Sequence, residues 1–415
     1  MESICESKLC TGCAACSQIC PQGAVKMAAN DEGFQYPNIN KELCTDCGLC
    51  RKKCPVNETM DTGSTKQDNA DSIKHKAYAC FSRDDDVRAG SSSGGVFSLL
   101  AQSVISRSGV VFGAEFDGDF RVRHNYAEKA DGLEALRRSK YVQSDTENTF
   151  IKAKEFLNAG REVLFCGTPC QIAGLKSFLN KEYDNLLTCD LACSGVPSPK
   201  VWKMYLDFMS DRYKSKVFSA SFRDKTEGWS CYNMRIDFEN GSRYIDKAKH
   251  ETFFIGFGKN IFNRISCFNC LFRMQNTKAD ITLADFWGID KQNDSDFLDN
   301  KGVSLLITNT EKGERELSRI RDKMIIKPEP LELATKYNPR LVSSVLEPGG
   351  RKSFFNDLRD GYTFDRLRRK YMDNYSIKYR VKGLLKLILG WTGKIGPRRN
   401  KTFYSRNQTT IKRTL

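Results

Sequence analysis

The chain has 415 residues, of which 40% are hydrophobic, with 66 Lys and Arg against 51 Asp and Glu, 17 Cys and only 3 His. This length and composition are typical of a globular protein with two or three domains and a buried core. The longest apolar stretch, around Leu384 to Leu389, is interrupted by Lys386, so we expect no segment that crosses a membrane.

The first ten residues, MESICESKLC, lack the charged region and apolar run of a secretory signal. We therefore expect the protein in a reducing cytoplasm, where 17 cysteines indicate metal or cluster ligation rather than disulfides.

The positive charge is concentrated at one end of the chain. Residues 351–415 hold 18 Lys and Arg against 4 Asp and Glu, a balance of +14, whereas the preceding 350 residues hold 48 against 47. The overall balance of +15 is therefore no nucleic-acid signature of the whole protein, and we assign residues 346–415 to a basic C-terminal tail.

Two blocks of four cysteines and a proline repeat near the N-terminus at an offset of 34 residues, and both read C-x2-C-x2-C-x3-C-P. In proteins with two [4Fe–4S] clusters and this spacing, the fourth Cys of each block binds the other cluster. The predicted ligands are Cys10, Cys13, Cys16 and Cys54 for one cluster, and Cys44, Cys47, Cys50 and Cys20 for the other. A zinc site needs four ligands and does not explain eight. Cys5 lies outside the pattern and is interpreted as a spare thiol.

Residues 8–57 resemble two-cluster bacterial ferredoxins, which implies one-electron transfer by a domain at residues 1–58. The polar stretch from Asn57 to Lys74 has no apolar periodicity and predicts a linker, assigned to residues 59–75.

From Lys76 onward, strand-like and helix-like segments alternate, which predicts a mixed α/β body at residues 76–345. Asn240-Gly241 marks a hairpin turn and hence an antiparallel section. The fold class is therefore α+β or α/β multidomain, with a ferredoxin-like N-terminal domain. The predicted strands are 77–81, 109–116, 161–166, 186–193, 217–224 and the two arms of 232–245, and the predicted helices are 94–107, 169–179 and 199–209.

Six cysteines of the body come in pairs, and four of them stand where a predicted strand gives way to a turn. The pairs are Cys166 and Cys170, Cys189 and Cys193, and Cys267 and Cys270. Thiolates at such positions can converge, which predicts a third cluster; the alternative is that several are buried apolar thiols. We assign Cys80 and Cys231 to that alternative.

The sequence contains few signs of catalytic or nucleotide-binding motifs apart from the cysteines. His75, His124 and His250 are scattered, so no His-based catalytic site is indicated and no catalytic residue is assigned. No G-x-G-x-x-G or P-loop is present, which argues against a Rossmann nicotinamide site and nucleotide hydrolysis. Residues 91–95, SSSGG, precede a predicted helix and suit a phosphate as well as an ordinary helix cap.

Taken together, six ordered blocks of the body resemble the beta subunits of coenzyme F420 hydrogenases and dehydrogenases. With the cysteine blocks, this resemblance spans residues 8 to about 345. The blocks are SSSGGVFSLLA (91–101), SKYVQS (139–144), LFCGTPCQIAGLKSFL (164–179), CDLACSGVPSPKVW (189–202), SFRDKTEGW (221–229), and ISCFNCLFR with ADITLADFWGI (265–273 and 279–289).

The resemblance implies one bound FAD and a third [4Fe–4S] cluster in the body. The ligands of that cluster would be Cys170, Cys193, Cys267 and Cys270. Cys166 and Cys189 fall outside the family pattern, and whether either replaces a ligand stays open. Ser194 stands where the family has His, which puts a proton-transfer role at that position in doubt.

The resemblance also implies which residues contact the flavin. Lys140 would balance the pyrophosphate charge and Trp287 would offer an aromatic face, although core packing is the alternative for Phe286 and Trp287. The implied contacts are Ser92, Ser93, Gly94, Gly95, Ser139, Lys140, Tyr141, Gln143, Gly167, Thr168, Asp285 and Trp287.

The family implies an iron–sulfur flavoprotein oxidoreductase that moves electrons between its clusters and a hydride carrier, coenzyme F420 or another small molecule, through FAD. Its partners would be that carrier and an electron-transfer protein such as ferredoxin. The resemblance extends to members associated with surface-polysaccharide synthesis. The alternatives are a non-catalytic electron-relay subunit of a larger complex, and a nucleic-acid-binding protein with structural clusters.

Within the basic tail, Leu384 to Trp391 combine apolar side chains with Lys382, Lys386 and Lys394. This pattern suits peripheral contact with an anionic inner membrane surface. The alternatives are a helical tail that packs on the body, and a contact with nucleic acid or an acidic protein.

Overall fold

A mixed eight-stranded sheet lies at the centre of the body in the computed structural model, which describes residues 3–61, 75–291 and 295–373. The strand order is β13-β3-β12-β11-β7-β6-β4-β5, and the neighbours β4, β6, β7 and β11 are parallel. Ligands of such sheets bind outside the carboxyl ends of the parallel strands. The strands are β3 (Lys76–Ser82), β4 (Val110–Phe116), β5 (Val122–Ala127), β6 (Val163–Cys166), β7 (Leu186–Leu191), β11 (Ile281–Asp285), β12 (Ser304–Thr308) and β13 (Met324–Glu329).

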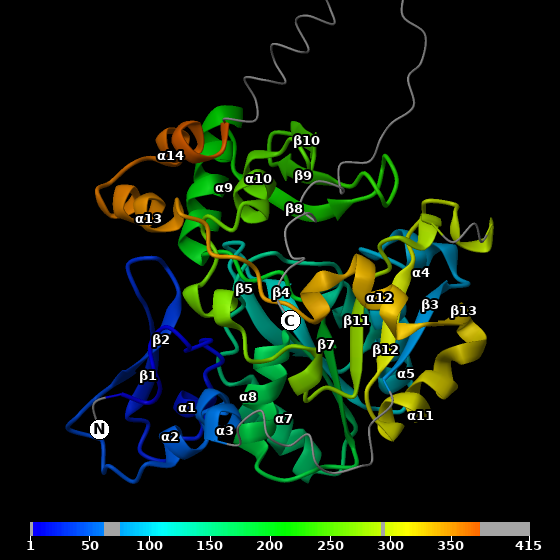
Figure 1. Ribbon diagram of the computed structural model, residues 1–415, viewed down its shortest axis with the longest axis horizontal. Helices are drawn as coiled ribbons and strands as arrows, with labels where there is room; N and C mark the ends of the chain where they lie inside the picture. Colours follow the sequence, from blue (N-terminus) through cyan, green and yellow to red (C-terminus); the bar gives the residue numbers. More distant parts are fainter. Residues whose placement is uncertain (1–2, 62–74, 292–294, 374–415) are drawn as a thin grey trace, which may run out of the picture. The chain divides into compact units, whose positions relative to one another are not determined.

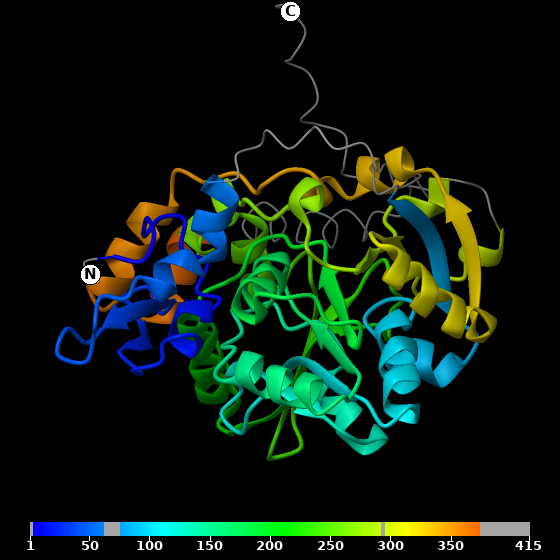
Figure 2. The same ribbon diagram turned by 90° about the horizontal axis from the view of Figure 1, so that it is seen from below.

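Helices cover both faces of this sheet, as Figures 1 and 2 show. On one face, α5 (Val96–Ser106), α6 (Leu133–Leu136) and α11 (Glu311–Ile320) pack on alternate strand residues such as Leu164 and Leu187. On the other face, α7 (Thr149–Asn158) and α8 (Pro169–Leu179) pack on the residues between them. The central strands are almost continuously buried because both faces are covered.

A second layer contains a three-stranded antiparallel sheet of order β10-β9-β8. Its hairpin turns at Asn240-Gly241, where Gly241 has a φ of 81°, so the hairpin predicted there is confirmed. An aromatic core that includes Trp202, Phe222 and Phe253 joins this sheet to the surrounding helices. The elements are β8 (Val217–Asp224), β9 (Asn233–Phe238), β10 (Arg243–Lys247), α9 (Pro199–Tyr213), α10 (Thr252–Gly258), α13 (Arg351–Arg359) and α14 (Phe364–Tyr371).

The N-terminal region repeats its backbone as well as its sequence. It consists of α1 (Ala15–Gln18), β1 (Val25–Ala29), β2 (Gln35–Ile39), α2 (Leu49–Lys52) and α3 (Pro55–Asp61). Gly12 and Asp46 have φ of 69° and 53°, and Ala14 and Gly48 have φ of 61° and 72°, so residues 34 apart share left-handed conformations. Each cysteine loop therefore makes the same turn. The expected ferredoxin-like region followed by an α/β body is confirmed.

Two segments differ from the expectation. The linker predicted from residue 59 begins inside α3, because Pro55 starts a helix that continues to Asp61; residues 62–74 lie outside the described part. At the other end, α13 and α14 follow the expected start of the tail but bury Phe354, Phe355 and Leu367 in the aromatic core. The compact unit accordingly extends to Met372.

The apolar and basic segment from Leu384 to Trp391, with its neighbouring lysines, lies outside the described residues. Among the helices that are described, none combines the length and apolar character that a bilayer span requires.

Candidate functional site

Four thiols of the two N-terminal blocks form a first group, made of Cys10, Cys13, Cys16 and Cys54. Every pair of them is close enough for one thiolate to repel another. Burial raises the pKa of Cys13 to about 12, whereas a hydrogen bond from the Cys5 thiol lowers the pKa of Cys10 to about 6. The fourth Cys of the second block thus joins three from the first.

The other four thiols of the two blocks form a second group. Cys20 of the first block lines one small cavity together with Cys44, Cys47 and Cys50. Burial raises the pKa of Cys50, and repulsion from Cys20 and Cys47 adds to this rise. The two groups therefore have the crossed membership that the spacing predicts.

A third group gathers Cys170 at the start of α8, Cys193 after β7, and Cys267 with Cys270. Again every pair interacts electrostatically, although Cys170 and Cys270 are separated by 100 positions in the chain. Burial raises the pKa of Cys170, Cys193 and Cys267 to about 12 each. Four thiols and no other ligand type form a donor set that suits a four-iron cluster.

Within residues 3–61, 75–291 and 295–373, no three His, Cys, Asp or Glu side chains have the spacing of ligands around one metal ion. The four thiolates of a [4Fe–4S] cluster bind four different irons and stand farther apart than the ligands of a single zinc ion.

The three groups are adjacent in series. Cys50 of the second group interacts with Cys16 of the first, and Cys13 of the first interacts with Cys170 of the third. Gly174 of α8 makes this last approach feasible, because a Cβ at that position would lie 2.9 Å from the Cys13 Sγ. The first group therefore stands between the other two.

Arg264 fastens the first group to the body. This buried side chain donates from Nε to the Cys10 carbonyl at 2.8 Å and from Nη1 to Gln143 Oε1 at 3.3 Å. Gln143, implied as a flavin contact, in turn donates from Nε2 to the Thr11 carbonyl at 3.3 Å. The structure thus places Gln143 against the first cysteine loop.

The single cysteines have different surroundings. Cys5, interpreted as a spare thiol, hydrogen-bonds to both Cys10 and Cys54, and with Cys10 it lines a cavity of about 690 Å³. Cys231 is exposed rather than buried, because it precedes β9 instead of lying inside a strand. Cys80 is fully buried, as expected.

Several of the implied flavin contacts meet near the carboxyl end of β11. Ser92 Oγ accepts from the Ser139 amide at 2.9 Å, which joins the first two sequence blocks. Arg223 donates from Nη2 to the Ser92 carbonyl at 3.1 Å and from Nη1 to the Tyr141 hydroxyl at 3.2 Å. Arg223 also forms a bidentate ion pair with Asp285, at 2.7 and 2.9 Å.

Two indoles complete this site. Trp229 donates from Nε1 to Asp285 Oδ1 at 2.7 Å, and its ring stacks on Trp287 with 4.9 Å between centroids and 6° between planes. Phe286, which precedes Trp287 in the chain, is fully buried in the core, whereas Trp287 is only half-buried. We call the set of Ser92, Ser139, Tyr141, Arg223, Trp229, Asp285 and Trp287 the polar cradle.

The polar cradle contains an unused buried donor. Arg223 is 4% exposed, and its Nε has no hydrogen-bond partner within the described part of the chain. Burial alone would lower the pKa of Arg223, but Asp285 outweighs burial and keeps the pKa above its ordinary value. A permanent buried cation with a spare N–H, beside a half-buried aromatic ring, fits the polar edge and the face of a flavin.

The remaining implied contacts mainly hold the protein together. Ser93 Oγ donates to the Val303 carbonyl at 2.8 Å, and the Gly94 amide donates to Ser304 Oγ at 2.9 Å. Gly95, with a φ of 94°, is the N-cap of α5. Lys140 Nζ donates to three backbone carbonyls, and burial lowers its pKa to about 7. This ammonium is thus turned toward the protein backbone.

Gly167 and Thr168 lie beside the third group instead. The Gly167 amide donates to the Cys189 carbonyl at 3.0 Å, and Thr168 Oγ1 lies 3.2 Å from Cys170 Sγ while it caps α8. Cys166 and Cys189 are register partners on β6 and β7. The group of four mutually interacting thiols consists of Cys170, Cys193, Cys267 and Cys270.

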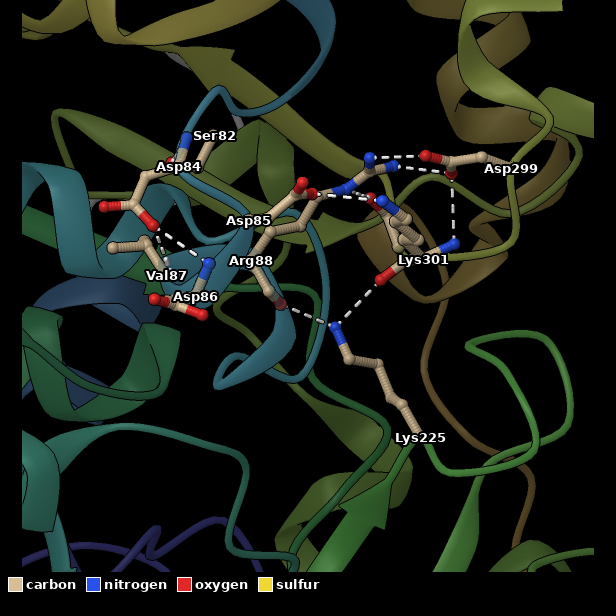
Figure 3. A network of polar contacts seen from close by, with 10 residues as sticks. Ser82, Asp84, Asp85, Asp86, Val87, Arg88, Lys225, Asp299 and Lys301 are labelled. Carbon is tan, nitrogen blue, oxygen red and sulfur yellow. Dashed lines mark hydrogen bonds and ion pairs between the residues drawn. The ribbon is translucent and has the colours of Figure 1, made fainter.

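Figure 3 shows a polar network around Arg88, and its member Lys225 also donates to the Ser93 carbonyl at 3.2 Å, next to Ser92. Lys225 donates to the Arg88 carbonyl at 2.7 Å and to the Lys301 carbonyl at 2.9 Å. The Arg88 side chain in turn pairs with Asp299 at 2.6 and 2.8 Å. The end of α4 (Asp85–Ala89) is thereby tied to both β8 and the loop before β12.

Sequence reasoning missed Arg223, Trp229, Arg264 and Gly174. The first two stand in the block SFRDKTEGW, whose resemblance to the family does not by itself give any residue a role. Neither Arg264 nor Gly174 carries a local signal, because their role depends on the packing of the N-terminal region against the body.

Comparison with known proteins gives two family matches. Residues 160–333 match the family described as the C terminus of the beta subunit of coenzyme F420 hydrogenase/dehydrogenase, and residues 9–57 match the 4Fe-4S dicluster domain. No curated protein matches the chain.

One similar solved structure is a chain of the F420-reducing [NiFe] hydrogenase complex from Methanosarcina barkeri, studied by xenon derivatization. It is 17% identical, with a TM-score of 0.41, and the match covers 71% of this chain and 90% of that one.

The N-terminal region is thus a dicluster domain with two [4Fe–4S] clusters. The match of the body places residues 160–333 in the coenzyme F420 hydrogenase/dehydrogenase beta subunit family, and the two matches together make the chain an iron–sulfur oxidoreductase.

Proposed function

We propose that the protein transfers electrons between its two N-terminal clusters and a small-molecule hydride carrier, coenzyme F420 or another, through a third [4Fe–4S] cluster and a bound FAD. The observation that carries the proposal is the serial arrangement of the three thiol groups, in which Cys13 is close enough to Cys170 to interact with it electrostatically. Such a series supports single-electron transfer between neighbouring clusters.

The third cluster would be held by Cys170, Cys193, Cys267 and Cys270. Arg273 supports this assignment, because it donates from Nη1 to the Cys193 carbonyl at 2.7 Å and to the Arg340 carbonyl at 2.8 Å. The cation fixes the loop after β7 and offsets negative charge at the thiolates. Such charges and hydrogen bonds set the potential of a cluster.

The flavin would lie in the polar cradle. Arg223 would face its polar edge, with Asp285 holding the guanidinium in place, and Trp287 would offer an aromatic face. When bound, FAD supplies the exchange between one-electron and two-electron carriers, which clusters alone lack. The implied contacts that hold backbone elsewhere, such as Lys140 and Gln143, would act by positioning this site.

Iron, flavin and reduction measurements test the proposal. Purified without oxygen, the full chain should hold about twelve irons, from three four-iron clusters, and one FAD. Cys193→Ser should lower the iron to about eight, whereas Cys80→Ser, a buried thiol outside every group, should keep all twelve. Eight irons in the unmodified chain, or no flavin, would refute it.

The second candidate is a relay subunit that passes electrons without reacting with a hydride carrier. The serial arrangement of thiols is compatible with this role as well. Reduced F420 and NADH, added in turn to the isolated flavin-loaded chain, distinguish the two. Bleaching of the flavin by either donor supports the oxidoreductase; bleaching by reduced ferredoxin alone supports the relay.

A further inference from the structure

We propose that Cys166 and Cys189 form a redox-active dithiol, which cycles to a disulfide at the carboxyl ends of β6 and β7. The two residues are register partners on adjacent parallel strands, so their side chains point to the same face of the sheet. This couple goes beyond the cluster and flavin chemistry proposed above and does not require a bound flavin.

The strand geometry permits the bond and keeps it reducible. Neighbouring strands lie about 4.8 Å apart, within the range of Cα separations that a disulfide spans. Side chains of register partners run parallel rather than toward each other, so closing the bond strains it slightly. Strained disulfides are the labile ones that take part in redox chemistry.

The two thiols differ in their surroundings, which gives them different roles. Cys189 is fully buried, whereas Cys166 is half-buried, so Cys166 is the more accessible of the two to a small reagent. The Cys189 thiol hydrogen-bonds to Cys166, and both burial and this bond raise its pKa. Cys166 would therefore attack first and Cys189 would resolve.

The surrounding contacts hold this pair in position. His124 Nε2 donates to the Cys166 carbonyl at 3.1 Å, and the Gly167 amide donates to the Cys189 carbonyl at 3.0 Å. Cys170 and Cys193 each follow four residues later in the chain. The pair thus stands on the two strands that lead directly into the third thiol group.

The reaction balances with a small-molecule disulfide as oxidant. The Cys166 thiolate attacks one sulfur of that disulfide and releases one thiolate. The Cys189 thiolate then attacks the sulfur of Cys166 and releases the second. The two protons lost by the protein thiols go to the two released thiolates, so one disulfide is reduced while Cys166–Cys189 is oxidised by two electrons.

The experiment uses the full chain with its clusters, equilibrated without oxygen in mixtures of reduced and oxidised dithiothreitol. Free thiols are then blocked with N-ethylmaleimide, and mass spectrometry measures the Cys166–Cys189 disulfide. As the ratio of oxidised to reduced dithiothreitol rises roughly 80-fold, we expect the fraction of this disulfide to rise from about one tenth to about nine tenths. The exposed Cys231 reports complete blocking in every sample.

Cys80→Ser is the matched control, because Cys80 is equally buried but lies on β3; its disulfide fraction should follow the unmodified chain. The inference is overturned if both thiols stay reduced in fully oxidised dithiothreitol, or if the disulfide forms only in chains that have lost iron. Flavin is measured in the same samples. If the disulfide forms in chains that bind no flavin, the disulfide supports this inference and the missing flavin refutes the proposed FAD site.

Discussion

Arg223 on β8 and Asp285 at the end of β11 form a bidentate ion pair, with N–O distances of 2.7 and 2.9 Å. The Arg223 side chain is only 1% exposed and that of Asp285 is 15% exposed. The pair therefore joins the second layer to the carboxyl edge of the central sheet, in the middle of the polar cradle.

Asp285→Asn tests the role of this pair in flavin binding. The change leaves a buried guanidinium without its counter-charge and replaces the oxygen that accepts from Arg223 Nη1 with an NH2 group, so we expect flavin occupancy to fall about tenfold, equivalent to ~1.4 kcal/mol. The measurement is flavin per iron in folded protein. Glu32→Gln is the control, because it neutralises the partner of another buried arginine, Arg351, outside the polar cradle. Equal flavin in both variants would contradict the assignment.

Gly174→Ala tests the contact between the dicluster domain and the body. The new Cβ would lie 2.9 Å from the Cys13 Sγ and 3.0 Å from its Cβ, so the α8 surface and the first cysteine loop must separate. We expect a loss of about 1–3 kcal/mol and faster loss of iron on mild heating. Gly118→Ala, where no atom lies within 4 Å of the added Cβ, should behave like the unmodified chain. Unchanged iron retention in Gly174→Ala would argue against this close contact.

Arg264→Gln tests the influence of a buried cation on the cluster of the first group. Because the guanidinium stands at the Cys10 carbonyl, it favours the more negative, reduced cluster. Its removal should lower the reduction potential of one cluster by about 60 mV, the one-electron equivalent of ~1.4 kcal/mol. Potentiometric titration followed by electron paramagnetic resonance measures the shift. Arg88→Gln, at a buried arginine paired with Asp299, should leave all potentials in place.

Glu251→Gln tests a buried carboxyl group at the N-cap of α10. Its side chain is fully buried and accepts from the Phe254 amide at 2.9 Å, and burial raises its pKa from 4.5 to about 7. The folded state therefore binds the proton more tightly than the unfolded state. This stabilisation is complete below pH 4.5 and is lost as the pH rises through 7, by roughly 3 kcal/mol in total.

Thermal melts between pH 5 and pH 8 check this sign. Glu251→Gln should remove the fall in stability that the ionisation of Glu251 causes as the pH rises. At pH 8 the variant should melt at a higher temperature than the unmodified chain. Asp84→Asn is the matched control, since Asp84 is an exposed N-cap of α4 and its loss should leave the slope with pH unchanged. A parallel pH profile for Glu251→Gln would contradict the predicted proton uptake.

Local patterns in the sequence already predict the cluster ligands of the N-terminal region, a helix and a turn of this protein. The two C-x2-C-x2-C-x3-C-P blocks predict two clusters with exchanged ligands, and helix 169–179 is found at the same residues, because Thr168 and Pro169 provide an N-cap and a first turn. The turn at Asn240-Gly241 follows from the left-handed conformation that Gly241 adopts. Each of these signals acts over a few residues, so short-range chemistry suffices to predict them.

Tertiary structure alone decided how these parts meet. Arg223 pairs with Asp285, 62 positions away in the chain, and Cys13 contacts Gly174, 161 positions away. No local sequence period encodes such contacts. Packing likewise directed Lys140 to backbone carbonyls, left Cys231 exposed and drew α13 and α14 into the aromatic core. Such outcomes depend on which buried surfaces and charges fit one another after the chain has folded, and this fit is a property of the whole molecule.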